Sequence, residues 1–172
     1  MNGGSVIGTS SLGNMPPAWA IAQVGDFDGD GKTDVLWRQT TSGAASLWLI
    51  DGGRVVASPA LGTVPTSWTI AAIGDFNGDG KADIVWRQDT GTVVIWLMNG
   101  GTVVGSIGLG NVPPAWVLAK VGDFNGDGKA DILWRNTSSG AVAMWLMSGP
   151  TVTSNLGLGT VATSWQTQEL TP

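Results

Sequence analysis

A short acidic string occurs three times in the chain at a nearly constant spacing, and this repetition constrains the fold more than any other feature. The string runs from Asp26 to Lys32, recurs from Asp75 to Lys81, and recurs again from Asp123 to Lys129. The copies begin 49 and then 48 residues apart. Self-similarity at such a period is typical of proteins built from stacked supersecondary units.

Tryptophan follows the same period. The chain has 10 Trp but only 3 Phe and no Tyr. The Trp residues form three sets, each with one member per repeat: Trp19, Trp68, Trp116 and Trp165; Trp37, Trp86 and Trp134; Trp48, Trp96 and Trp145. A ring of this size, used so often, is either buried in a core or displayed as a binding platform.

Each repeat predicts four strands. In the middle copy, apolar runs rich in β-branched residues lie at 68–73, 83–87, 92–98 and 102–107. Turn signals separate them, and Asn99-Gly100 predicts a hairpin turn that needs positive φ. Runs that are apolar on both faces are expected of strands packed between neighbouring sheets. Four short antiparallel strands in a period of about 45 residues are typical of a β-propeller blade.

The sequence therefore predicts an all-β fold in a single domain over residues 1–172. Three complete blades of four antiparallel strands are expected at about 19–62, 68–110 and 116–159. The first residues match the last in register, with Met1 at the position of Met147 and Trp19 at that of Trp165, so isolated strands are expected at about 4–12 and 165–170.

Three blades do not close a ring, because propellers have roughly four to eight. An open array leaves strand edges and apolar faces uncovered. We therefore expect self-association, most simply a homodimer that completes one ring of six or seven blades. The alternative is that the sequence is a piece of a larger propeller.

The acidic strings predict metal loops. Oxygen ligands at positions 1, 3, 5 and 9, separated by glycines, let a short loop wrap around a hard cation, and the backbone carbonyl at position 7 adds a ligand. The predicted ligands are Asp26, Asp28, Asp30, Lys32 and Asp34; Asp75, Asn77, Asp79, Lys81 and Asp83; and Asp123, Asn125, Asp127, Lys129 and Asp131.

Calcium suits these loops better than magnesium, because it takes six to eight oxygen ligands in irregular geometry. About three Ca²⁺ ions per chain are expected. The strings resemble the first half of an EF-hand loop, but position 12 holds Trp37 instead of glutamate. The alternative interpretation is a plain polar turn, which Asp, Asn and Gly also favour. Three copies that all keep Asp at position 9 favour the metal.

Composition excludes several kinds of function. The chain has no Cys and no His, which removes disulfides, thiolate and imidazole metal sites, and the usual nucleophile–base pairs. Ten of its 13 acidic residues lie in the three loops, and Asp51, Asp89 and Glu169 do not recur together. We therefore expect no enzyme activity. No basic stripe predicts nucleic-acid binding, and no apolar run is long enough to span a membrane.

At these residues the chain resembles the FG-GAP and VCBS-type repeats of integrin-like β-propellers. The resemblance is carried by the string Asp-Phe-Asn-Gly-Asp-Gly-Lys-Ala-Asp from Asp75 and the string Trp-Leu-Met-Asn-Gly from Trp96. It implies a seven-bladed propeller, calcium between the first two strands of a blade, and extracellular adhesion or ligand recognition. Similar repeats in fungal and bacterial lectins bind sugars between blades. The number of blades in this chain departs from that pattern.

Two functions follow as hypotheses. In the first, the module binds glycans through paired Trp and Arg side chains, since aromatic faces stack on sugars and Arg donates to hydroxyls. The candidate residues are Trp37, Arg38, Trp86, Arg87, Trp134 and Arg135. These rings are also well placed to pack between blades. In the second, the chain is a calcium-stabilised scaffold for a surface protein. Either function suits an extracellular or cell-surface location, although the N-terminus has no signal-peptide pattern.

Overall fold

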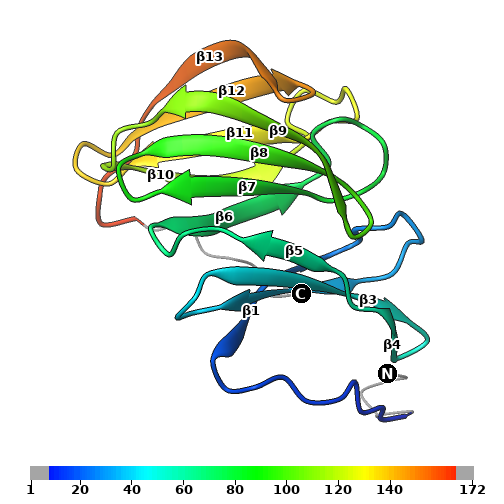
Figure 1. Ribbon diagram of the computed structural model, residues 1–172. Helices are drawn as coiled ribbons and strands as arrows, with labels where there is room; N and C mark the ends of the chain where they lie inside the picture. Colours follow the sequence, from blue (N-terminus) through cyan, green and yellow to red (C-terminus); the bar gives the residue numbers. More distant parts are fainter. Residues whose placement is uncertain (1–7, 166–172) are drawn as a thin grey trace.

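The computed structural model describes residues 8–165, and every helix or strand element in this range is a β-strand. The strands form three antiparallel sheets that follow one another along the chain (Figure 1). Sheet 1 contains β1 (Trp19–Gly25), β2 (Asp34–Gln39), β3 (Ala44–Asp51), β4 (Arg54–Ala57) and β5 (Ala60–Thr63). Sheet 2 contains β6 (Trp68–Gly74), β7 (Asp83–Gln88), β8 (Thr92–Asn99) and β9 (Thr102–Asn111). Sheet 3 contains β10 (Trp116–Gly122), β11 (Asp131–Asn136), β12 (Ala141–Ser148) and β13 (Thr151–Thr160).

The prediction of an all-β chain with four-stranded antiparallel repeats is confirmed. Sheets 2 and 3 are meanders in which consecutive strands pair, so the strand order follows the sequence, and the first four strands of sheet 1 follow the same order. The isolated strands expected at about 4–12 and 165–170 lie mostly outside the described residues. Residues 8–12 and Trp165, which are described, belong to no strand. The structure also contains no helix, among the residues it describes, that is long and apolar enough to cross a membrane.

Sheet 1 departs from its expected form in its outer strand. A single fourth strand was predicted, but two short strands, β4 and β5, both pair with β3. The break falls at Ser58-Pro59. Proline has no N–H for the ladder, whereas the equivalent position of β9 is Ile107, which pairs with Ile95. The Pro59 carbonyl still accepts a hydrogen bond from the Leu47 amide (3.0 Å).

The hairpin between β8 and β9 turns one residue later than predicted. Asn99 pairs with Thr102, so Gly100 and Gly101 occupy the two central positions of the turn. Gly100 has a φ of 56°, while Asn99 keeps the negative φ of a strand residue. The positive φ therefore falls on the residue without a side chain, as hairpin turns prefer.

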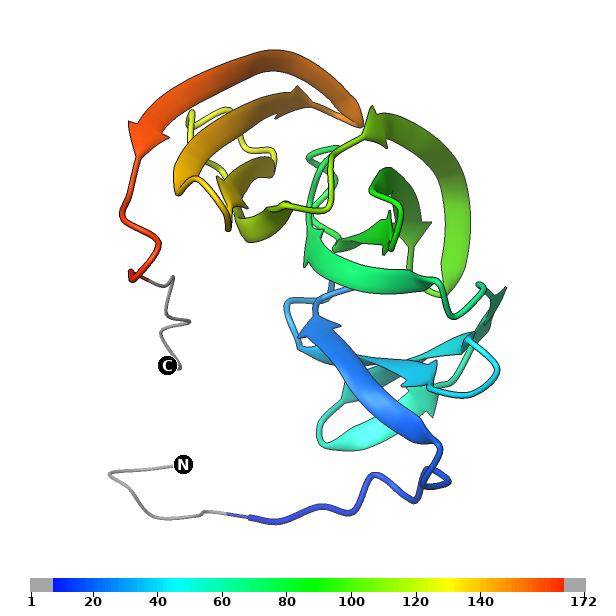
Figure 2. The ribbon, with the colours of Figure 1, turned by 90° about the vertical axis from the view of Figure 1, so that its left-hand side faces the viewer.

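The three sheets lie along an arc (Figure 2). Two hydrophobic clusters fill the joints between consecutive sheets. The first is built around Phe27, Leu36 and Leu47 of sheet 1 and Ile84, Trp86 and Met98 of sheet 2. The second is built around Phe76, Val85 and Ile95 of sheet 2 and Ile132, Trp134 and Met147 of sheet 3.

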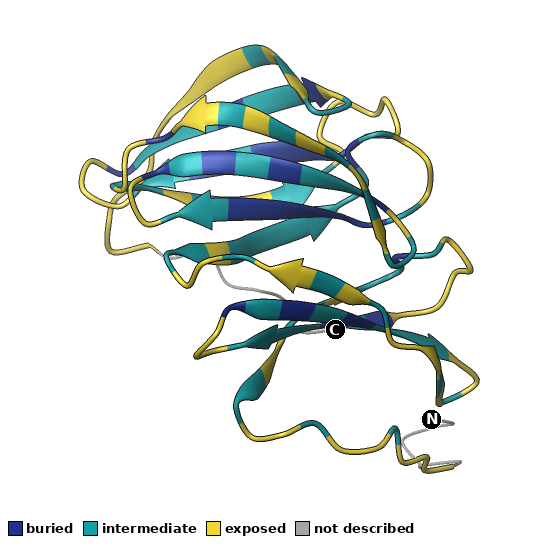
Figure 3. Cartoon of the chain, in the orientation of Figure 1, coloured by how far each residue is buried: buried dark blue, intermediate teal, exposed yellow. Residues whose placement is uncertain are grey.

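Because sheet 2 takes part in both clusters, its central strands are buried most completely (Figure 3). Four consecutive residues of β7, Asp83–Trp86, are buried. The apolar run of β7, which shows no alternation in the sequence, is thus explained by a sheet that is covered on both faces.

Candidate functional site

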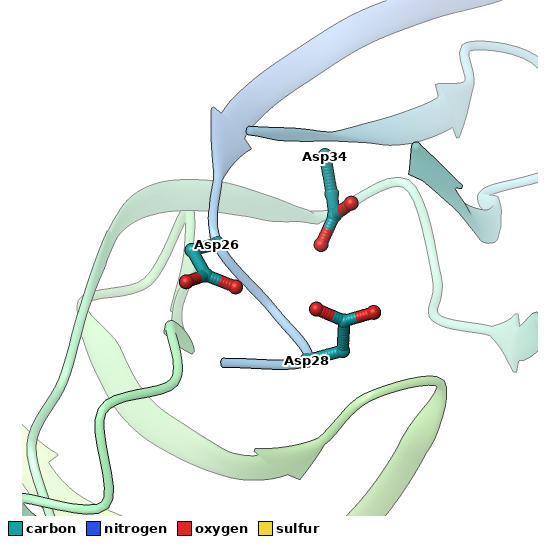
Figure 4. A group of neighbouring side chains, drawn as sticks. All are labelled: Asp26, Asp28 and Asp34. Carbon is teal, nitrogen blue, oxygen red and sulfur yellow. The ribbon is translucent and has the colours of Figure 1, made fainter. Parts of the chain in front are cut away.

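The loop between β1 and β2 brings three carboxylates together. One oxygen from each of Asp26, Asp28 and Asp34 lies within 4.8 Å of the other two. Figure 4 shows the three side chains turned toward a common space. Clustered carboxylate oxygens are the donor set that hard divalent cations prefer, and they repel one another unless a cation or protons neutralise them. The donor set therefore fits Ca²⁺.

The first aspartate of each string organises its own loop. Both oxygens of Asp26 accept backbone hydrogen bonds, from Gly29 at 2.7 Å and Gly31 at 2.8 Å. Both glycines have positive φ, which lets the chain curl around the carboxylate. Asp75 and Asp123 accept the equivalent bonds in their loops. A carboxylate has about four acceptor positions, so these bonds leave room for a cation.

The ninth-position aspartate has a structural role that the sequence did not indicate. Asp34 is buried, and its two oxygens accept hydrogen bonds from the amides of Phe27 (2.9 Å) and Ile50 (2.8 Å). It thereby ties the start of the loop to β3. Asp83 and Asp131 make the same pair of bonds in sheets 2 and 3.

Burial affects the ionisation of these aspartates. Desolvation raises the pKa of the Asp34 carboxyl above its ordinary value, against the lowering effect of its backbone hydrogen bonds. The same cause raises the pKa of Asp83 to about 6. A cation bound beside either carboxylate would favour its ionised form.

The fifth and seventh positions pair with each other in the first loop. The Lys32 ammonium lies 2.7 Å from Asp30 and 3.2 Å from Asp51, and its hydrogen bond lowers the pKa of Asp30. In the other loops, the carboxylates of Asp79 and Asp127 accept from the side-chain amides of Asn77 (3.1 Å) and Asn125 (3.3 Å) respectively. Metal coordination by these aspartates and by the Lys32, Lys81 and Lys129 carbonyls stays a prediction.

The Trp-Arg pairs lie at the joints between sheets. Trp86 and Trp134 are 1% and 2% exposed. The Arg38 guanidinium of sheet 1 lies 4.9 Å from the ring centroid of Trp86 in sheet 2, and Arg87 lies 5.3 Å from that of Trp134 in sheet 3. A buried ring covered by an arginine offers no face to a sugar, so this geometry favours the packing interpretation of these residues.

Backbone carbonyls complete the environment of each arginine. Arg38 donates to the carbonyls of Gly43, Val64 (2.6 Å), Pro65 (3.2 Å) and Trp68 (3.3 Å). Arg87 donates to those of Val112 and Pro113, and Arg135 to that of Ala162 (2.8 Å). These bonds satisfy charged groups that burial would otherwise penalise. The remaining candidate ring, Trp37, is half-buried and packs edge-to-face against Trp48 with centroids 5.0 Å apart.

A recess that the sequence did not indicate lies where sheets 2 and 3 meet. Its volume is about 320 Å³. It is lined by Asn111, Val112 and Pro113 of β9 and its connector, and by Trp116, Trp134, Ala143, Trp145 and Asn155 of sheet 3. The residue equivalent to Ala143 in sheet 2 is Val94, which packs into the first joint. The smaller side chain at position 143 was the available sequence signal.

Three antiparallel sheets with an aspartate-rich loop between the first two strands of each define a class, the antiparallel β-repeat proteins with aspartate-rich loops. Within that class the chain belongs to the FG-GAP-like repeat family, whose model matches residues 26–86 and 75–134. The resemblance drawn from the sequence is thus confirmed. Comparison with curated proteins finds no match.

A solved structure with a similar fold is the Photorhabdus luminescens Tc holotoxin pore. The TM-score is 0.58 at 18% sequence identity, over 85% of this chain. The match covers 7% of the holotoxin chain, so the similarity describes the fold of one small part of that protein.

Proposed function

We propose that the chain is a calcium-binding module of the β-propeller type that recognises carbohydrate. The arc of three meandering sheets in Figure 2 supports the arrangement as propeller blades. The carboxylate cluster of Asp26, Asp28 and Asp34 supports calcium in the first loop. The matching backbone contacts of Asp75 and Asp123 extend this proposal to one ion per loop.

The recess between sheets 2 and 3 carries the carbohydrate proposal. The lining indoles of Trp116 and Trp145 are only half-buried, unlike Trp134, so their surfaces remain open to a ligand. Asn111 and Asn155 place amide donors and acceptors at the same recess. An aromatic wall with a few fixed polar groups is the usual composition of a small-ligand site, and indoles stack on the C–H faces of sugars.

A glycan array with the calcium-loaded protein tests this function. Reproducible binding to a related set of sugars supports it, and a blank array with folded, calcium-loaded protein contradicts it. The decisive variant is Ala143→Val, which narrows the recess with the side chain already found at position 94. Val94→Ala at the other joint is the matched control. Binding lost in Ala143→Val and kept in Val94→Ala places the sugar in this recess.

Calcium is tested separately by isothermal titration of metal-free protein. About three ions per chain are expected. Asn77→Ala should weaken binding of one of them without unfolding the chain, because among the described residues its side chain forms hydrogen bonds with Asp79 alone. A titration in which calcium produces no heat of binding would contradict the metal proposal.

The second candidate function is a calcium-stabilised scaffold that binds a surface protein. The buried Arg-Trp joints favour it, because they commit most of the distinctive side chains to packing. A cation present at a hundred times its Kd would stabilise such a scaffold by about 2.7 kcal/mol. In either function the module acts outside the cell, where calcium is millimolar and suits loops of moderate affinity. We propose no catalytic activity, because the clustered carboxylates are assigned to cations.

A further inference from the structure

Each joint between consecutive sheets uses the same contacts from equivalent residues. At the first joint, the Phe27 ring is fully buried against sheet 2. Ile73 of sheet 2 fills the space above Gly25, where a Cβ atom would lie 2.5 Å from its Cδ1. The Ala82 amide donates to the Asp26 carbonyl at 2.7 Å.

The second joint repeats these contacts one period later. Phe76 is fully buried against sheet 3, and Val121 fills the space above Gly74. The Ala130 amide donates to the Asp75 carbonyl, again at 2.7 Å. Together with the Arg-Trp stacking, these contacts define a leading and a trailing half of a joint. The first sheet supplies Phe, Gly, Asp and Arg, and the second supplies an aliphatic residue, an amide and Trp.

The outer face of sheet 3 carries a complete leading half. Phe124 is 46% exposed, although the equivalent Phe27 and Phe76 are fully buried. Among the described residues other than the two chain neighbours of Gly122, the atom nearest to a Cβ atom placed there belongs to the Phe124 ring, at 4.0 Å. Val161 is 43% exposed, whereas its equivalent Val112 is buried against sheet 3.

The outer face of sheet 1 carries a complete trailing half. Val24, the equivalent of Ile73, is 51% exposed, and Ile21 beside it is 59% exposed. Thr33 stands at the position of Ala82, and Trp37 at the position of Trp86. Among the described residues, no arginine lies over the Trp37 ring, and none of the Trp rings lies under Arg135.

We propose that the outer face of sheet 3 binds the outer face of sheet 1 of a second copy of this chain, and that two copies close into a six-sheet ring. Arg135 would stack on Trp37 of the second copy. The Arg135 guanidinium already donates to the Ala162 carbonyl, as Arg87 donates to the equivalent carbonyl of Pro113. Val24 of the second copy would cover Gly122, and its Thr33 amide would donate to the Asp123 carbonyl.

The complementarity is head-to-tail, which favours a copy of the chain over an unrelated partner. The two faces are halves of a joint that the molecule already makes twice, and the cationic Arg135 matches an aromatic ring. Head-to-tail contacts form rings when their rotation closes and filaments when it does not. The three sheets curve along an arc (Figure 2), so a second chain continues the curvature back toward the first.

Native mass spectrometry and sedimentation of the intact chain test the proposal. The wild type should have twice the mass of one chain, while Val24→Asp and Phe124→Ser, each of which removes one face, should be monomers. Mixing these two variants should restore a one-to-one dimer, because each supplies the face that the other lacks. Val104→Asp is the control, since Val104 is 60% exposed on β9, outside both faces.

Three results would overturn the proposal: a wild type that stays monomeric at every concentration, a mixture that does not pair, or single variants that still dimerise. Circular dichroism verifies that each variant is folded. Ile21→Asp and Arg135→Ala probe the same two faces if either first variant does not fold.

Discussion

The aspartate loops of sheets 2 and 3 carry identical residues at every predicted ligand position but have different surroundings. Within each loop the backbone contacts agree: Asp75 and Asp123 both accept hydrogen bonds from two glycine amides. Outside the loops they differ, because the loop of sheet 2 is covered by sheet 3. Comparing them separates what the local sequence determines from what a neighbouring sheet adds.

The neighbouring sheet adds three contacts to the loop of sheet 2. The Asp75 carbonyl accepts from Ala130, Phe76 is buried, and the Lys129 side chain packs over Gly78, with its Cγ 3.5 Å from the position of a Cβ atom there. Among the residues described, the loop of sheet 3 has no such cover. The local motif thus determines the shape of the loop. The contacts from the neighbouring sheet then incorporate the loop into the packed joint between the two sheets.

The largest expected difference is in the phenylalanines of the two loops. Phe76→Ala should lower the free energy of unfolding by about 4 kcal/mol, because it removes a fully buried ring and leaves a cavity. Phe124→Ala should cost less than about 1 kcal/mol. Urea unfolding in the monomeric Val24→Asp background measures both values. Equal losses would mean that the outer face of sheet 3 is covered within a single chain.

The ninth-position aspartates come next. Asp83→Ala leaves two buried amides, Phe76 and Met98, without acceptors and should cost about 3 kcal/mol, with or without calcium. Asp131→Ala should cost less, because Phe124 beside it is partly exposed to water. The same unfolding experiment in a chelator measures the difference. If Asp83→Ala lowered the free energy of unfolding only in the presence of calcium, the role of Asp83 would be metal binding alone.

Calcium affinity should differ between the two loops by about tenfold, or about 1.4 kcal/mol. The loop of sheet 2 is held by sheet 3 before the ion arrives, so it loses less conformational freedom on binding. Isothermal titration of Asn77→Ala and Asn125→Ala assigns each affinity, because each variant weakens one loop. Equal affinities would show that the ligand residues alone determine calcium binding.

The remaining effect concerns pH. In metal-free protein, burial raises the pKa of Asp83 from 3.8 to about 6, so the folded chain holds this proton more tightly than the unfolded chain. Its contribution to stability is therefore greatest below about pH 4 and falls as the pH rises to about 6. The unfolding free energy of the wild type, relative to Asp83→Asn, should fall across this window in a chelator. A rise would contradict the direction of the shift.

Repetition made most of the fold predictable from the sequence. The strand positions of sheets 2 and 3 and the three loops follow from the period, because equivalent residues take equivalent places. The period did not predict the split in the outer strand of sheet 1. Pro59 interrupts that strand, whereas the equivalent residue of the middle repeat, Ile107, lies within a continuous strand. The hairpin was placed one residue early because Asn99-Gly100 is a stronger turn signal than Gly100-Gly101.

The site was less predictable because its contacts cross between repeats. Arg38 and Trp86 are adjacent in space but almost one period apart in the sequence, so their pairing requires the spacing between sheets. Asp34 was expected only as a metal ligand, because a sequence does not reveal that the Phe27 and Ile50 amides converge on its carboxylate. The aspartate cluster itself was predicted, because its residues lie within one short loop.

The exchange of Val94 for Ala143 between otherwise equivalent joints illustrates how a duplicated sheet can diverge. Ala143 has two methyl groups fewer than Val94, and a recess of about 320 Å³ lies at its joint. The strands of both sheets nevertheless pair in the same register. Stability rests on the clusters at every joint, so one joint can change while the others preserve the fold. A repeat chain of this kind can therefore evolve new surfaces one interface at a time.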